Sequence, residues 1–219
     1  MKAAGNLRRK SKSAVPRRRD AGKPDTKNSR SSVRVLTVGH STRSLEDFLS
    51  LLRAHGVQCV VDIRTVPRSR HNPQFDKMTL PDALRQAGIG YMHMAGLGGL
   101  RKPRRDSPNG GWKNASFRGY ADYMQTPEFV ASLQKLLPLA QNQCIALLCA
   151  EAVPWRCHRS LVADALTVRN IPVEHILSAT RRQEHRVTPW AKVHGSQISY
   201  PPDSLSFEFD SGQHKRPRP

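Results

Sequence analysis

The 219-residue sequence has few of the features that mark membrane, secreted or disulfide-stabilised proteins. No apolar stretch approaches the ~18 residues that a membrane-spanning helix needs. Residues 1–20 contain no apolar run of the kind found in secretory signals. Four cysteines are too few for a disulfide scaffold of this size. We therefore expect a protein of the reducing cytoplasm, without a membrane partner.

Acidic side chains are also scarce, with 17 Asp and Glu against 36 Lys and Arg, a formal net charge of +19. Residues 1–32 contribute +9 of this charge and residues 203–219 contribute none, so residues 33–202 carry +10. This balance favours polyanionic partners, and we expect nucleic acid or a nucleotide. The oligomeric state is left open.

The two ends of the chain differ from its centre in composition. Residues 1–32 are rich in Arg, Lys and Ser and have no helical period of apolar residues, which predicts a disordered basic arm. Residues 200–219 predict a second disordered tail, rich in Pro. Residues 33–199 between them predict a single α/β domain.

The central segment alternates apolar strands with amphipathic helices. Strands are expected at residues 33–38, 57–63, 90–94, 144–149 and 173–177, and the last of these is expected to end the sheet. Helices are expected after Ser44 as far as Gly56 and over 79–87, 127–140 and 157–169. This order is typical of a three-layer fold, a mainly parallel sheet flanked by helices. Residues 95–120 are predicted to form one long loop, and such loops are usually functional.

Polar residues gather where the predicted strands end, and ligands of open parallel sheets bind at that edge. The candidate substrate-binding residues after the first two strands are His40, Ser41, Arg64, Arg68 and Arg70. A guanidinium group matches two phosphate oxygens at once, so the arginines predict a phosphate clamp. Asp62 either performs acid–base catalysis or pairs with one of these arginines.

The densest polar cluster follows the strand 144–149, and its candidate residues are Cys149, Glu151, Arg156, Cys157, His158 and Arg159. A helix N-terminus and neighbouring cationic groups lower the pKa of a thiol, so Cys157 or Cys149 could be a nucleophile. Alternatively, helix N–H groups with Arg156 and Arg159 could hold a phosphate. Glu151 would act as a general acid or base, or orient an arginine. The remaining alternative is a buried Cys149 and a simple helix cap at Cys157.

A metal site in this cluster is not expected. The spacing of Cys149, Cys157 and His158 matches no standard zinc knuckle, which uses closely spaced cysteine pairs. Adjacent residues of a helix also point in different directions. We predict no metal and no cofactor.

Aromatic and basic residues alternate between residues 101 and 123, a pattern that suits base stacking on a single strand. We count Tyr120 among the candidate substrate-binding residues. The alternative is that Phe117 and Tyr120 close the core beneath the loop.

Six motifs occur in order over about residues 35–178: Thr37-Val-Gly-His-Ser41, Val61-Asp-Ile-Arg64, Asn72-Pro-Gln-Phe75, Leu97-Gly-Gly99, Phe117-Arg-Gly-Tyr-Ala-Asp-Tyr-Met124 and Cys149-Ala-Glu151 with Cys157-His-Arg159. With them the sequence resembles the bacterial family catalogued as domain of unknown function 488. The resemblance implies a small α/β domain and no established reaction. A weaker likeness to rhodanese domains rests on Asp62, Arg64 and Cys149, but the loop after Cys149 is longer here and lacks their compact glycine-bearing turn.

These observations lead us to expect an enzyme that acts on a phosphate-bearing substrate, nucleic acid or a nucleotide, as in DNA processing or repair. Its candidate catalytic residues are Asp62, Cys149, Glu151, Cys157 and His158. One alternative is a non-enzymatic nucleic-acid-binding protein. Another is rhodanese-like sulfur chemistry at Cys149 or Cys157.

Overall fold

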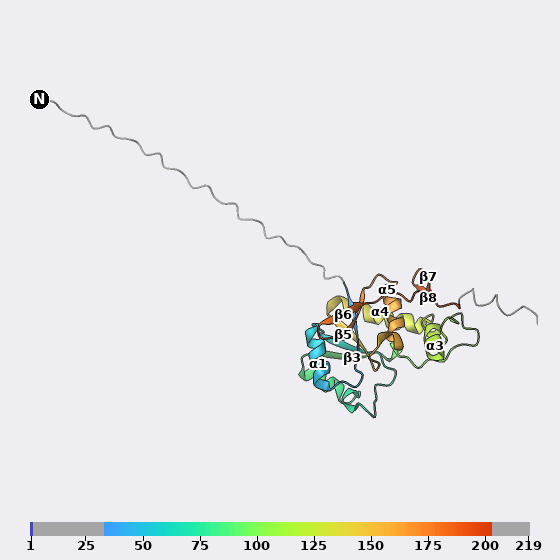
Figure 1. The fold of residues 1–219 in the computed structure, drawn as a ribbon, viewed down its shortest axis with the longest axis horizontal. Coiled ribbons are helices and arrows are strands. Elements are labelled where there is room, and N and C mark those ends of the chain that lie inside the picture. Colours follow the sequence, from blue (N-terminus) through green and yellow to red (C-terminus); the bar gives the residue numbers. More distant parts are fainter. Residues whose placement is uncertain (2–32, 203–219) are drawn as a thin grey trace, which may run out of the picture. The chain divides into compact units, whose positions relative to one another are not determined.

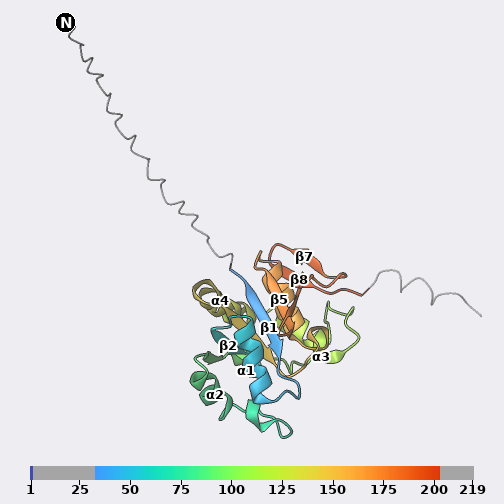
Figure 2. The same ribbon diagram turned by 60° about the vertical axis from the view of Figure 1, so that its left-hand side comes forward.

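The computed structural model describes Met1 and residues 33–202. The predicted basic arm and most of the predicted C-terminal tail lie outside these residues. The described chain forms a six-stranded sheet with helices on both of its faces (Figures 1 and 2), which confirms the expected fold class.

The sheet has the strand order β3-β2-β4-β1-β5-β6. Its strands are β1 (Val35–Gly39), β2 (Cys59–Asp62), β3 (Gly90–His93), β4 (Ile145–Cys149), β5 (Val173–Ser178) and β6 (Arg181–Glu184). The first five are parallel, whereas β6 pairs antiparallel with β5. Because β4 lies between β1 and β2, the carboxyl ends of these three strands are neighbours.

The helices are α1 (Leu45–Ala54), α2 (Leu80–Gln86), α3 (Ala115–Tyr123), α4 (Pro127–Asn142) and α5 (Arg159–Thr167). Helices α1 and α2 bury their apolar residues on one face of the sheet, and α3, α4 and α5 bury theirs on the other. Helix α1 begins as predicted, because the side chain of Ser44 accepts a hydrogen bond from the backbone N–H of Asp47 at 3.0 Å.

The segment 95–120 is not one long loop, because α3 begins inside it. Asn114 caps this helix by accepting from the N–H of Ser116 at 2.8 Å. The buried face of α3 includes Gly119, whose close packing on the backbone of Arg101 leaves no room for a side chain, and the carboxylate of Asp122. Because a glycine and an aspartate stand on the buried face, the sequence lacks the helical spacing of apolar residues that would have predicted α3.

The chain also continues beyond the strand that was expected to be last. After β6 come β7 (Lys192–His194) and β8 (Gln197–Ser199), which pair with each other. The tail was expected to begin at Tyr200, but Tyr200 is fully buried, and its hydroxyl donates to Asp164 at 2.8 Å. The ordered fold therefore includes this residue.

A buried chain of hydrogen bonds anchors the segment after β5. His185 Nε2 donates to Asp164 at 2.7 Å, because a carboxylate only accepts. His185 Nδ1 lies 3.0 Å from His175 Nε2, and His175 Nδ1 lies 2.7 Å from the hydroxyl oxygen of Thr37. Burial, with smaller effects of His185 and Arg159, lowers the pKa of His175 to about 3.

Candidate active site

A cleft of about 600 Å³ opens at the carboxyl ends of β1, β2 and β4. We call it the cysteine cleft. It brings together these sequence-predicted residues: His40, Ser41, Arg64, Arg68, Cys149, Glu151, Arg156, Cys157 and His158. Three strand ends and the start of α5 thus contribute to one site, as expected for an open parallel sheet.

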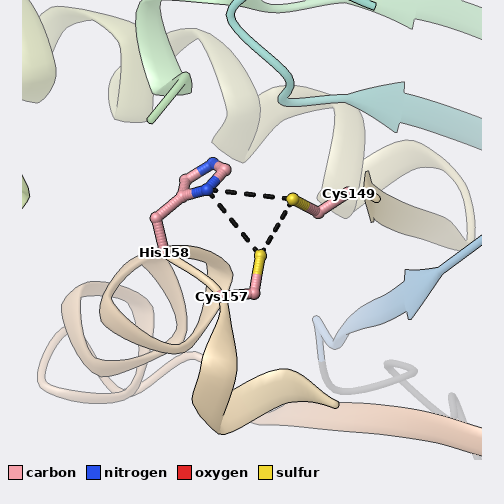
Figure 3. A group of neighbouring side chains, drawn as sticks. All are labelled: Cys149, Cys157 and His158. Atoms are coloured by element: carbon pink, nitrogen blue, oxygen red, sulfur yellow. Dashed lines mark hydrogen bonds between the residues drawn. The ribbon is translucent and has the colours of Figure 1, made fainter. Parts of the chain in front are cut away.

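Cys149, Cys157 and His158 form a compact cluster in the wall of the cleft (Figure 3). The two Sγ atoms lie 2.8 Å apart, and His158 Nδ1 lies 3.8 Å from Cys149 Sγ and 3.7 Å from Cys157 Sγ. Cys149 is the last residue of β4, whereas Cys157 follows the 3₁₀ turn Pro154–Arg156 (η3).

The expectation that Cys157 and His158 point in different directions is wrong. It assumed that both residues stand inside a helix. Instead, Cys157 has an extended backbone, with φ −134° and ψ 144°, and His158 is the N-cap of α5. The chain bends between them, so both side chains reach Cys149.

The backbone of β2 sets the orientation of His158. Its Nε2 lies 3.1 Å from the carbonyl oxygen of Ile63, which can only accept, so Nε2 carries a proton. Nδ1 is thereby the nitrogen that faces the sulfur atoms. The Tyr120 ring packs against the imidazole at 5.0 Å between centroids.

Tyr120 itself does not contact the cleft, which corrects its assignment as a substrate-binding residue. Its side chain is buried, and its hydroxyl donates to the carbonyl of Leu97 at 2.7 Å. The alternative interpretation, in which Tyr120 closes the core, is the one that the structure supports. Its neighbour Phe117 does line the cysteine cleft.

The two thiols differ in pKa. The hydrogen bond from the Cys157 thiol, aided by His158 and the charge of Arg159, lowers the pKa of Cys149 well below its ordinary value, against the effect of burial. The same hydrogen bond and burial raise the pKa of Cys157. These directions describe one coupled pair that shares a proton, with the thiolate favoured at Cys149 and the thiol at Cys157.

Arg159 is not a phosphate ligand in this structure. It is 1% exposed, and its guanidinium donates to the carbonyls of Glu151 at 2.5 Å and Ala152 at 2.7 Å. Its backbone N–H points to Cys157 Sγ at 3.5 Å. Arg159 thus fixes the loop between the two cysteines and places a positive charge behind them. Gly39 must be a glycine, because a Cβ there would overlap the same Glu151 carbonyl.

Asp62 likewise pairs with an arginine and does not line the cleft, which matches the second of its two expected roles. It is fully buried and receives the fork of Arg64, with Nε at 2.9 Å and Nη2 at 2.6 Å. Arg64 Nη1 lies 3.3 Å from His40 Nε2. Since His40 Nδ1 donates to the carbonyl of Ser41 at 2.8 Å, Nε2 accepts, consistent with the pKa of His40, which burial lowers.

The remaining predicted residues separate into two groups. The exposed side chains of Arg68 and Arg156 line the cleft, whereas Arg70 is exposed but does not line it. The polar lining residues that sequence reasoning missed include Thr42, Thr65, Asn72 and Ser116. Asn72 stands in one of the resemblance motifs, which is the signal that could have found it.

The cluster could also bind a thiophilic metal ion, because its three donor atoms lie within 4.8 Å of one another. Zn–S bonds of ~2.3 Å in a tetrahedral site would hold the two sulfur atoms ~3.8 Å apart. The observed separation is 2.8 Å, so the sulfur atoms would have to move apart by about 1 Å. A zinc site is therefore not preformed in this arrangement.

Comparison with known protein families adds one finding. The family model described as Domain of unknown function DUF488 matches residues 44–166, more than half of the chain. The chain belongs to this family. The match covers the ends of β2 and β4 and the start of α5, and so includes Arg64, Cys149, Cys157 and His158, whereas the end of β1 with His40 lies before it. No curated protein and no solved structure matches the chain.

In the part of the chain that the structure describes, no helix combines the length and the apolar character that a membrane crossing requires.

Proposed function

We propose that the protein is an enzyme that uses the Cys149 thiolate as a covalent nucleophile on a phosphate-bearing substrate, a nucleotide or a nucleic acid. The observation that carries this proposal is the Cys149 sulfur in the wall of the cleft, 2.8 Å from the Cys157 sulfur and opposite His158 Nδ1. A stable thiolate is the form of cysteine that attacks electrophiles.

The cleft walls support an anionic substrate. The exposed arginines Arg68 and Arg156 line it. Arg64 donates from Nε and Nη2 to the Asp62 carboxylate, and Nη2 also donates to the Phe75 carbonyl. One Nη1 N–H donates to His40, so the second Nη1 N–H has no partner among the described residues. These donors suit phosphate oxygens.

The proposed reaction proceeds in two steps. The Cys149 sulfur forms a bond to the electrophilic atom of the substrate, and the leaving group departs with the bonding electron pair and takes a proton from Glu151. Water then attacks the covalent intermediate, returns a proton to Glu151 and releases the thiolate. The sum is hydrolysis, and it requires no metal or redox partner. A reducing compartment such as the cytoplasm would keep both cysteines reduced, without a disulfide bond between them, as the first step requires.

A panel of nucleotides and nucleic acids tests the proposal, with intact-mass measurement to trap the covalent intermediate. We expect Cys149→Ser to abolish both turnover and adduct. Cys144→Ser is the matched control, because Cys144 lies outside the cleft and burial raises its pKa. We expect Glu151→Gln to slow turnover and prolong the adduct. Equal behaviour of wild type and Cys149→Ser would exclude a nucleophilic Cys149, and binding without turnover would favour a non-enzymatic nucleic-acid-binding protein.

Sulfur transfer is a second candidate, favoured by the closeness of the two sulfur atoms. It predicts that Cys149 accepts a sulfur atom from a persulfide donor, seen as a mass increase of one sulfur that Cys149→Ser lacks.

A further inference from the structure

A second cleft, also of about 600 Å³, lies beyond the cysteine cleft and is lined by all three tryptophans, Trp112, Trp155 and Trp190. We call it the tryptophan cleft. His185 and the basic Arg186 line its wall beside the acidic Glu184. None of the reaction steps above uses it.

Two of the three tryptophans are open to solvent, and the third, Trp112, is half-buried. Trp155 is 63% exposed and Trp190 is 40% exposed. Trp112 holds Trp190 edge-on, at 5.2 Å between ring centroids, and its own Nε1 has no hydrogen-bond partner among the described residues. Large indole faces exposed beside basic groups are typical of surfaces on which nucleobases stack.

Two contacts show that the clefts are neighbours. In the turn η3, Trp155 lines the tryptophan cleft, and the next residue, Arg156, lines the cysteine cleft. Trp112 also packs against Phe117 at 4.8 Å between ring centroids, with the rings tilted by 32°, and these two residues again line one cleft each. Turn η3 and this aromatic pair therefore form the boundary between the two clefts, which we call the ridge.

We propose that a single-stranded nucleic acid crosses this ridge, with a phosphate on Arg156 and adjacent bases stacked on Trp155 and Trp190. The inference rests on the proposed function, since it names the substrate class of the same site. Consecutive residues that present an arginine and an indole match the alternation of phosphate and base along one strand. The net charge of +10 on residues 33–202 complements the strand. A duplex keeps its bases paired and cannot offer their faces, whereas a mononucleotide does not reach both clefts.

The test is binding of the full chain to a fluorescein-labelled oligodeoxynucleotide of about 16 nucleotides, single-stranded or in a duplex. We expect Trp155→Ala and Trp190→Ala each to weaken single-strand binding at least fivefold, because stacking contributes about that much or more per base. Binding of the duplex should change little. Met78→Ala is the control, since Met78 is 84% exposed and lies in neither cleft.

A second readout separates this inference from the proposed function. Iodoacetamide is small and needs no stacking surface, so its reaction with Cys149 should be the same in Trp155→Ala and wild type. If the oligonucleotide binds equally well to wild type and both tryptophan variants, or if the duplex loses affinity as much as the single strand, the inference is wrong. If binding depends on Trp155 but no turnover depends on Cys149, the inference stands and the proposed enzyme function falls.

Discussion

At the scale of single residues, we expect the hydrogen bond from Cys157 to Cys149 to set the reactivity of the site, because it is the largest cause of the lowered pKa of Cys149. In Cys157→Ala this donor is lost, while His158 and Arg159 remain. We therefore expect the pKa of Cys149 to rise and its alkylation to require a higher pH than in wild type. Alkylation rates measured from pH 5 to 10 (an assay range chosen to span ordinary thiol behaviour, about pH 8–9) would show this. Superimposable profiles would mean that Cys157 does not donate to Cys149.

The lowered pKa of His175 predicts that the folded protein loses stability in acid. Its folded pKa of about 3 lies below the ordinary value of 6.5, so the unfolded chain binds a proton that the folded chain does not. The contribution of this histidine is complete above pH 6.5 and is lost as the pH falls towards 3, by at most about 1.4 kcal/mol per pH unit. Urea unfolding at pH 7, 6, 5 and 4 measures the slope.

The variant His175→Gln provides the comparison for this slope. It cannot take up the proton, and so its stability, although lower at pH 7, should fall less steeply between pH 6 and 4. An equal slope in wild type and variant would assign the acid sensitivity to other groups.

Chelation and added Zn²⁺ distinguish a thiol–thiolate pair from a zinc centre at Cys149, Cys157 and His158. If the site is a thiol–thiolate pair, extensive treatment with a chelator should leave turnover unchanged, because no step depends on an ion. Added Zn²⁺ should compete for the thiolate and slow alkylation of Cys149. Loss of turnover on chelation, restored by Zn²⁺, would contradict a nucleophilic Cys149 and favour a zinc centre.

At the scale of elements, the end of β1 and the loop after β4 must approach each other closely. Gly39→Ala would place a methyl group on the carbonyl of Glu151, which Arg159 also holds. We expect a loss of about 1–3 kcal/mol in stability together with reduced Cys149 reactivity, since the loop carries the site. Gly56→Ala is the control, because Gly56 has φ +64° and open space around it, so it should lower stability without changing reactivity.

The elements also show what the sequence could predict. Strands β1, β2 and β4 are mostly apolar and buried at every residue, and so the parallel sheet and the meeting of its polar ends followed from the pattern. Strands β6 and β7 are exposed along their whole length and contain no such run. They form because the fold beneath provides a partner strand or a buried anchor, as Asp164 does for His185 and Tyr200.

The same reasoning explains the errors at the site. Residue type and position near a strand end indicated a polar cluster with Cys149, Cys157 and His158, but the side-chain directions were predicted wrongly because they depend on the bend at Cys157. Because Arg159 and Asp62 are charged and lie near strand ends, the sequence suggested that both side chains face a ligand. Their burial against carbonyl groups and a partner side chain becomes visible only once the loops are folded.

At the scale of the whole molecule, the basic charge predicts strong salt dependence. If phosphate contacts dominate, the logarithm of the affinity for single strands should fall linearly with the logarithm of the salt concentration. Arg156→Gln should make this slope shallower by about 0.7, because it removes one phosphate contact. An unchanged slope would place Arg156 outside the nucleic-acid interface.

The most direct test of the account compares the four cysteines of the whole protein with one another. Limited alkylation of the native chain at pH 6, followed by peptide mass analysis, reports which thiol reacts first. Solvent exposure alone would favour Cys144, since Cys59, Cys149 and Cys157 are buried. The account predicts that Cys149 reacts first despite its burial, because it alone of the four has a lowered pKa. Preferential labelling of Cys144, with Cys149 unmodified until alkaline pH, would contradict a nucleophilic thiolate in the cysteine cleft.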